Sequence, residues 1–177
     1  DYLIQQSAQQ RYQLSHFAKL SASNSIKLTE LARQYVVTLQ PSYKKQYYEL
    51  VNQIEGTEPW LDGRKKSYID RLKEFNVNEQ ELALLNKSNS LSLQLVNTEE
   101  QAFQLVSSFA GQSPSLLSTS ESKQWVQAIG LLTDKGYMDE VAKIQTPVQE
   151  FLAAVENSSL QEVMNNNNRV ANLSLIS

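Results

Sequence analysis

The sequence predicts an all-α protein: an elongated up-down-up-down four-helix bundle with a broken second helix and a short distal cap helix. The first observation is a shortage of helix-breaking residues, since the 177-residue chain has only five glycines and four prolines. Residues 1–40, 64–110 and 148–177 contain neither, and strands rarely exceed about 10 residues. The second observation is that apolar residues in these spans recur every three or four positions, as in packed helices. We expect residues 1–177 to form one domain.

Residues 1–40 form the first predicted helix. Its apolar seam consists of Leu14, Phe17, Leu28, Leu31 and Tyr35. At ~1.5 Å per residue, a helix of this length spans roughly 60 Å, so we expect a rod-shaped molecule. Polar residues interrupt the seam of this helix and that of a later one. They predict either a hydrated interior layer or a place where helices approach closely; the residues are Ser21, Asn24, Ser88 and Ser92.

The second predicted helix covers residues 41–55 and is interrupted soon afterwards. Pro41 suits the first turn of a helix, and Gly56 suits the position just after its end. Residues 57–63 are expected to form a turn, because they include a proline and a second glycine. A helical pattern then resumes over residues 64–75, so the second helix is predicted to be broken rather than absent.

The third long helix is predicted to begin at Asn78. Glu81 stands three residues later, which is the spacing of a capping box. The apolar residues that follow keep a seven-residue spacing up to Phe109. Beyond it we expect a loop over residues 111–120 and a short helix over residues 121–133.

The last helix is predicted to begin near Gly136 and to continue past Pro147, where a kink is expected if the helix is continuous. If both termini lie at one end of the rod, the long helices must alternate in direction, which gives the up-down-up-down order. Both ends of the chain lie inside amphipathic patterns, so we expect it to be a segment of a longer protein.

Composition argues against several functional classes. A chain without cysteine and with one histidine cannot supply a thiolate nucleophile, and it offers few metal or triad arrangements. The net charge of −3 disfavours nucleic-acid binding, which usually needs a basic patch. We therefore predict no enzyme activity, no catalytic residue, no metal and no cofactor. His16 is interpreted as an ordinary helix residue.

Two charged residues lie near the predicted seams. Arg33 follows the apolar residues of the first helix, and Glu99 occupies an equivalent place on the third. One interpretation is a partly buried ion pair that fixes the helix register. The other is that Arg33 receives an anionic ligand, because a guanidinium group matches a carboxylate.

Aromatic residues cluster around the broken second helix. They either pack a capping element or form the wall of a small-molecule pocket, in which aromatic side chains are common. The candidate ligand-binding residues are Arg33, Tyr47, Tyr48, Trp60 and Arg64.

Several segments resemble the sensor regions of bacterial methyl-accepting chemotaxis receptors. The first is Leu28-Thr29-Glu30-Leu31-Ala32-Arg33-Gln34-Tyr35-Val36-Val37-Thr38, followed by Tyr43 to Tyr47 and by Gly56 with Pro59. The others are Asn78 to Ala102, and Tyr137 with Lys143-Ile144-Gln145-Thr146-Pro147-Val148 and Phe151.

This resemblance implies the periplasmic sensor domain of an inner-membrane receptor, held between two transmembrane helices and working as a homodimer. It implies a small-molecule ligand, anionic if Arg33 binds it, whose binding displaces the last helix and signals to a cytoplasmic module. Similar sensor regions occur on histidine kinases and diguanylate cyclases. The competing interpretation is a helical scaffold whose exposed seam binds a partner protein.

Overall fold

The computed structural model describes the backbone of residues 2–176 and the side chains of residues 8–176. Within this part of the chain there are six α-helices, two short 3-10 helices and no strand, which confirms the all-α prediction. The α-helices are α1 (Tyr2–Thr38), α2 (Pro41–Glu55), α3 (Tyr68–Leu72), α4 (Glu79–Val106), α5 (Thr119–Leu131) and α6 (Lys135–Ile176). The 3-10 helices are η1 (Ser107–Phe109) and η2 (Pro114–Leu116).

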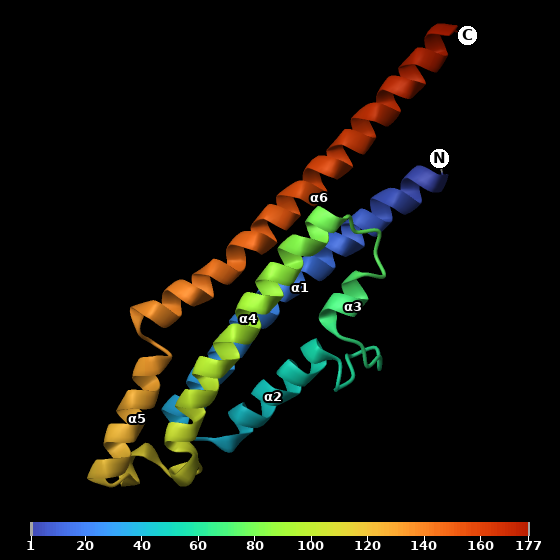
Figure 1. The fold of residues 1–177 in the computed structure, drawn as a ribbon. Coiled ribbons are helices and arrows are strands. Elements are labelled where there is room, and N and C mark those ends of the chain that lie inside the picture. The colour runs from blue at the N-terminus through green and yellow to red at the C-terminus, as the bar shows by residue number, and fades with distance from the viewer. Residues whose placement is uncertain (1, 177) are drawn as a thin grey trace.

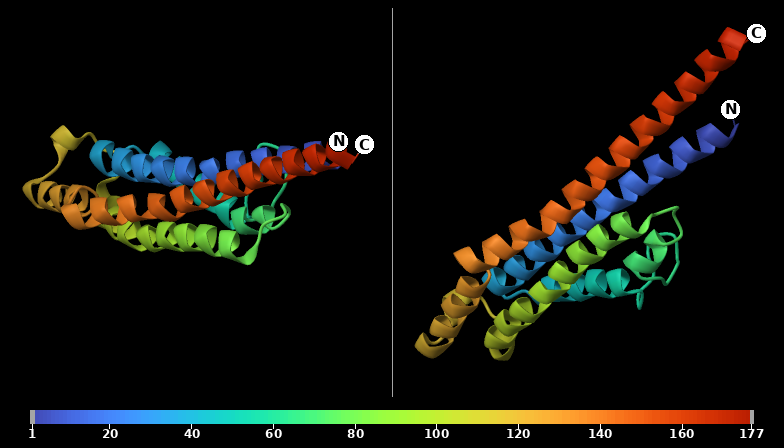
Figure 2. Two further views of the ribbon diagram at one scale, coloured as in Figure 1. Left: turned by 90° about the horizontal axis from the view of Figure 1, so that it is seen from above. Right: turned by 45° about the horizontal axis from the view of Figure 1, so that its top comes forward.

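The long helices lie side by side and alternate in direction (Figure 1). α1 runs away from the end that holds both termini, α2 and α3 return toward it, α4 runs away again, and α6 returns. α6 packs on both α1 and α4. α5 lies at the opposite end, here called the distal end, beside α4 (Figure 2). The terminal part of α6 extends beyond the other helices.

The corner between α1 and α2 depends on Leu39. This residue has a left-handed backbone conformation with φ of 59°, which is costly for a residue with a side chain. Two features offset the cost. The leucine side chain is fully buried, and its carbonyl accepts a hydrogen bond from the Gly111 N–H at 2.6 Å. α1 therefore ends at Thr38, and the corner is tied to the distal loop.

The interruption after α2 is longer than predicted. The expected helix over 64–75 contains only the five residues of α3, because residues 64–67 are used in other bonds. Trp60 donates its backbone N–H to the Arg64 carbonyl at 3.0 Å and its indole N–H to the Lys66 carbonyl at 2.6 Å. Ser67 then caps α3 by accepting the Asp70 N–H.

The predicted capping box at the start of α4 is confirmed. The Asn78 side chain accepts the Glu81 N–H at 2.7 Å, and the Glu81 carboxylate accepts the Asn78 N–H at 3.1 Å. The second oxygen of Glu81 accepts from Arg11 of α1 at 2.9 Å. α5 begins two residues earlier than predicted, because Ser118 and Glu121 form a second capping box.

The core consists of two clusters with a polar layer between them. The distal core contains α2 and the distal halves of α1 and α4, and the proximal core lies nearer the termini around Leu14, Leu85 and Phe151. Between them Ser88 donates to the Ile144 carbonyl at 2.9 Å. A cavity of about 10 Å³, room for roughly one water molecule, is lined mainly by polar residues; its walls include Ser21, Asn24, Asn89 and Ser92. Ser88 is fully buried and bonds directly to α6, so close helix approach accounts for this residue, whereas the cavity leaves room for a water molecule beside the other three.

α6 continues through Pro147. Proline has no N–H to donate within a helix, so this is the place where α6 lacks one of its own hydrogen bonds. The bond from Ser88 reaches α6 three residues earlier, at Ile144. The polar layer thus lies within one turn of the proline of α6.

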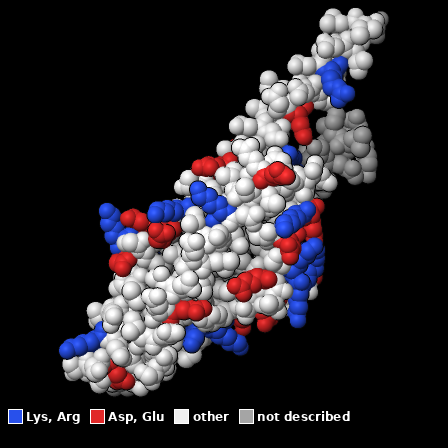
Figure 3. All heavy atoms as spheres, in the orientation of Figure 1, with Lys and Arg blue, Asp and Glu red and all other residues white. Residues whose placement is uncertain are grey.

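Acidic and basic side chains are interspersed on the face shown in Figure 3, without a large patch of one sign. Among the described residues, no helix is both long and apolar enough to cross a membrane.

Substituting the two glycines of the loop after α2 tests the close packing there. Gly56 has φ of 90°, and a Cβ at this position would lie 2.5 Å from the Ser67 nitrogen. Gly63 has φ of 81°, but a Cβ there would meet no atom within 4 Å. We expect Gly63→Ala to lower the free energy of unfolding by about 1–2 kcal/mol through backbone strain alone. Gly56→Ala should lower the free energy of unfolding clearly more, as measured by urea denaturation. Equal losses in the two variants would contradict the close approach of Gly56 to Ser67.

Candidate functional site

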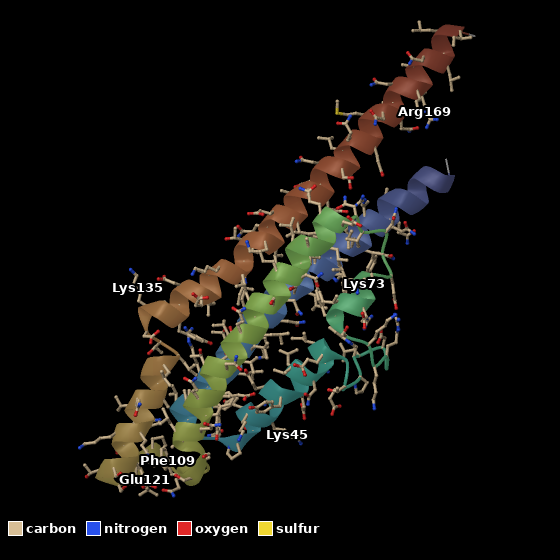
Figure 4. All side chains as sticks on the ribbon, in the orientation of Figure 1. Lys45, Lys73, Phe109, Glu121, Lys135 and Arg169 are labelled. Carbon is tan, nitrogen blue, oxygen red and sulfur yellow. The ribbon has the colours of Figure 1, made fainter. Side chains whose placement is uncertain are left out.

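The candidate site is a group of four polar side chains in the distal core, which we call the Glu99 cluster. It consists of Arg33, Tyr47, Glu99 and Tyr137, one residue each from α1, α2, α4 and α6. Figure 4 labels Phe109 at the distal end and Lys135 at the start of α6, and the cluster lies in this half of the molecule. Polar side chains of four helices therefore lie close together here.

Helix periodicity places these residues in the interior. Glu99 lies four positions after Leu95 and four before Phe103, and both are buried, so the three share one face of α4. Tyr47 lies four positions before Val51 on the buried face of α2. Glu99 thus occupies a core position although it is charged in water at neutral pH.

The Glu99 carboxylate is bound by two tyrosines. The Tyr47 hydroxyl donates to Oε1 at 2.9 Å, and the Tyr137 hydroxyl donates to Oε2 at 2.8 Å. Glu99 is only 2% exposed and Tyr47 is not exposed at all. Each carboxylate oxygen therefore has one donor, and the carboxylate joins α2 and α6 to α4.

Arg33 is held close to this group but does not pair with Glu99. Its Nε donates to the Leu132 carbonyl at 2.8 Å, and its guanidinium carbon lies 5.4 Å from the centre of the Tyr137 ring. Over the described residues, no ion pair within 4.0 Å joins Arg33 to Glu99, so the expected ion pair is replaced by the two tyrosine bonds. The physical reason is that Leu132, the residue that follows α5, offers Arg33 a carbonyl acceptor.

Burial dominates the electrostatics of the cluster. It raises the pKa of Glu99 from 4.5 to about 7, although the two tyrosine hydroxyls and the charge of Arg33 lower it. Because folding favours the neutral acid, the contribution of Glu99 to stability is fully present below pH 4.5 and is lost as the pH rises through about 7. The pKa of Tyr137 is raised by burial and then by the neighbouring Glu99 charge.

Tyr48 is the third predicted binding residue in this region. It is half-buried, and its ring packs edge-on against Tyr47 at 5.1 Å and against Phe103 at 6.2 Å between ring centres. Burial raises the pKa of Tyr48 to about 12, with the Glu100 charge adding to the shift. The structure therefore brings Arg33, Tyr47 and Tyr48 into one neighbourhood.

Trp60 and Arg64 lie elsewhere, in the loop between α2 and α3. The Trp60 ring lies 4.9 Å from the Arg71 guanidinium. Arg64 binds the Glu74 carboxylate with both of its terminal nitrogens. The side chains of these two predicted binding residues are used in holding the loop together. The five predicted residues thus form two separate groups rather than one pocket.

Two residues of this region, Tyr137 and Trp125, were not predicted to lie here. Tyr137 supplies one of the two hydroxyl groups that bind the Glu99 carboxylate, an arrangement we call the clamp. The Trp125 indole N–H donates to the Val36 carbonyl at 2.8 Å, which fixes α5 against α1. The signal available in the sequence was a tyrosine in the middle of the second helix and another near the start of the last helix, opposite a glutamate at a core position.

A second hollow, not anticipated from the sequence, is a groove of about 350 Å³ between α1 and α6, nearer the termini. Its walls mix cationic, anionic and apolar side chains. They include Arg11, Tyr12, Lys19, Leu152, Glu156 and Val163.

Within the described part of the chain, no group of three or more histidine, cysteine, aspartate or glutamate side chains could hold a metal ion. Comparison of the chain with protein-family models, with curated proteins and with solved structures finds no match.

Removing one tyrosine hydroxyl tests the clamp. Tyr137→Phe leaves a buried carboxylate oxygen without its donor. At pH 8, where Glu99 is ionised, we expect a loss of about 1.5–3 kcal/mol in the free energy of unfolding, the range for a hydrogen bond to a charged group. At pH 5, where the acid is neutral, the loss should be about 0.5–1.5 kcal/mol. Tyr12→Phe, at an exposed position, is the matched control for urea denaturation. A loss independent of pH would contradict the clamp.

Proposed function

We propose that this chain is the periplasmic, ligand-sensing domain of a transmembrane chemoreceptor, and that its long helices form an up-down-up-down four-helix bundle. α2 and α3 together are the broken second member of the bundle, and α5 is the distal cap. The alternation of helix directions supports this arrangement (Figure 2). The proposed domain binds a small molecule at its distal half and has no catalytic role.

The observation that carries the proposal is the relation between α1 and α6. The two helices pack on each other, run in opposite directions and reach the same end of the molecule (Figure 1). In a receptor of this kind they would continue toward the membrane. A ligand that favours one packing of the distal core would then move α6 against α1, since packed helices shift in discrete steps of ~1–2 Å.

Arg33 supplies the contact proposed for an anionic ligand. Its Nε is bound to the Leu132 carbonyl, which fixes the plane of the guanidinium group. In the part of the chain whose side chains are described, its two terminal nitrogens have no hydrogen-bond partner. They are therefore able to receive a carboxylate in a two-point contact. Because Arg33 covers the Tyr137 ring, a ligand bound there would act directly on the first turn of α6.

The exposed part of α6 supports the homodimer of the proposed receptor. Beyond the proximal core, the helix exposes apolar side chains at helical spacing. They are Leu160, Val163, Met164, Val170 and Leu173. A second copy of the chain could cover this row of side chains in a membrane-anchored dimer. The row also favours the alternative function, a helical scaffold that binds a partner protein.

The sequence that the gene encodes on either side of this chain would distinguish the receptor from the scaffold. Apolar segments of about 20 residues before and after it, long enough to cross a membrane, are expected for the receptor. Their absence would favour the scaffold. The proposed output is a chemotaxis module; a histidine kinase or diguanylate cyclase would be distinguished by the cytoplasmic sequence that follows.

A thermal-shift screen of dicarboxylates, amino acids, amines and sugars tests the ligand proposal. A ligand at 100-fold excess over its Kd should add about 2.7 kcal/mol to the free energy of unfolding. We expect a dicarboxylate or amino acid to raise the melting temperature of the wild type and of Lys45→Ala, an exposed control on α2. The shift should vanish in Arg33→Ala. A full shift in that variant would contradict the assignment of Arg33, and no shift with any class would contradict direct sensing.

A further inference from the structure

A third hollow lies at the distal end, between α4 and α5, which lie side by side (Figure 1). Its volume is about 420 Å³, and small-molecule sites usually measure about 300–1,000 Å³. We call it the glutamine groove, because four of the residues that line it are Gln101, Gln104, Gln124 and Gln127. Two serines and two leucines complete the lining.

The glutamines form two facing walls. Gln101 and Gln104 belong to α4, and Gln124 and Gln127 belong to α5. The members of each pair are three residues apart, so they project from one side of their helix. On α5 the next residue, Ala128, is fully buried. The walls therefore rise on either side of the seam where the two helices pack, and both present carboxamide groups.

The wall formed by α5 is held in place without the help of the glutamines. A capping box of Ser118 and Glu121 fixes its start. In its middle the Trp125 indole N–H donates to the Val36 carbonyl at 2.8 Å, and the Leu132 carbonyl just after it accepts a hydrogen bond from α1. The shape of the groove is therefore set before a ligand arrives, which reduces the entropy lost on binding.

The four carboxamides are free to bind a ligand. Among the described residues, their side chains form no hydrogen bond, whereas Gln53 donates its side-chain N–H to the Pro59 carbonyl. A carboxamide has both N–H donors and an acceptor oxygen. A hydroxyl group also donates and accepts, so two walls of carboxamides match a molecule that carries hydroxyl groups on several sides.

The rest of the lining favours a neutral ligand. Of the residues described, none that lines the groove is charged, so a charged ligand would lose water there without gaining an opposite charge. Leu105 and Leu131 are half-buried and add apolar surface. The C–H groups of a sugar ring can cover such a surface, while the hydroxyl groups at the edge of the ring reach the walls.

We propose that the glutamine groove is a binding site for a neutral carbohydrate. The carboxamides bind the ring hydroxyls from both walls, and Leu105 and Leu131 contact the ring carbons. This site is additional to the one proposed at Arg33, whose ligand is anionic, and it does not depend on a receptor output.

Titration of the leucine methyl ¹³C resonances with glucose, galactose and mannose tests the site. We expect at least one of these sugars to shift Leu105 and Leu131 saturably and to leave Leu160, an exposed leucine of α6, unchanged. The corresponding uronates carry a carboxylate in place of the terminal alcohol and should bind more weakly. A linear trimer of the sugar that binds separates two sources: tighter binding of the trimer indicates a segment of a polysaccharide, and equal or weaker binding indicates a free sugar.

Gln104→Ala combined with Gln127→Ala removes one carboxamide from each wall. The loss of two hydrogen bonds should raise the Kd about tenfold or more. The matched control combines Gln80→Ala and Gln149→Ala, which replace exposed glutamines of α4 and α6 outside the groove, and it should bind as the wild type does. Because all four positions are exposed, both double variants should keep the wild-type melting temperature, so a loss of binding is not a loss of folding.

The site is overturned if no neutral sugar produces a saturable shift, if a uronate binds as tightly as its neutral sugar, or if the groove variant keeps the wild-type Kd. The substitutions in the groove leave Arg33 in place, so the thermal shift expected from an anionic ligand should persist in them. Failure of the carbohydrate site is therefore distinct from failure of the proposed ligand sensing at Arg33.

Discussion

The bonds from Tyr47 and Tyr137 to the carboxylate of Glu99 connect helices that are otherwise joined mainly by apolar contacts. The hydrophobic effect is non-directional, whereas hydrogen bonds of 2.9 Å and 2.8 Å to one carboxylate constrain the relative rotation of α2, α4 and α6. Arg33 adds α1 to this arrangement through the Tyr137 ring and the end of α5. The register of the whole distal core therefore depends on a group that is costly to bury when it is ionised.

The rest of the structure is divided, along the length of the molecule, into the distal core and the proximal core. The distal core is anchored by aromatic packing, by the Glu99 cluster and by the bond from Trp125 to Val36. The proximal core is smaller, and a polar layer separates the two near Ser88 and Pro147. A change at the distal end would thus reach the termini through α6, across the turn where that helix lacks a bond of its own.

The helices could be predicted from the sequence because their signals are local. The proline that begins α2, the glycine that follows it and the capping box at Asn78 act over three or four residues and are where they were expected. The helix predicted over residues 64–75 was too long, because Trp60 donates hydrogen bonds to the carbonyls of Arg64 and Lys66. Hydrophobic periodicity does not encode such contacts. Glu99 and Arg33 were found as seam residues, but their partners depend on how four helices meet, so an ion pair was expected where two tyrosines bind.

The measurement that tests the account most directly is the pKa of Glu99 itself, from the pH dependence of its side-chain carboxyl ¹³C resonance, assigned by comparison with Glu99→Gln. A buried carboxylate clamped by two tyrosines, with a cation nearby but not paired, should titrate near pH 7. Removing the Tyr47 hydroxyl should raise that value further, because the donor favours the ionised form. A value near 4.5, unchanged in Tyr47→Phe, would mean that the carboxylate is solvated or paired and that the three helices are not joined through it.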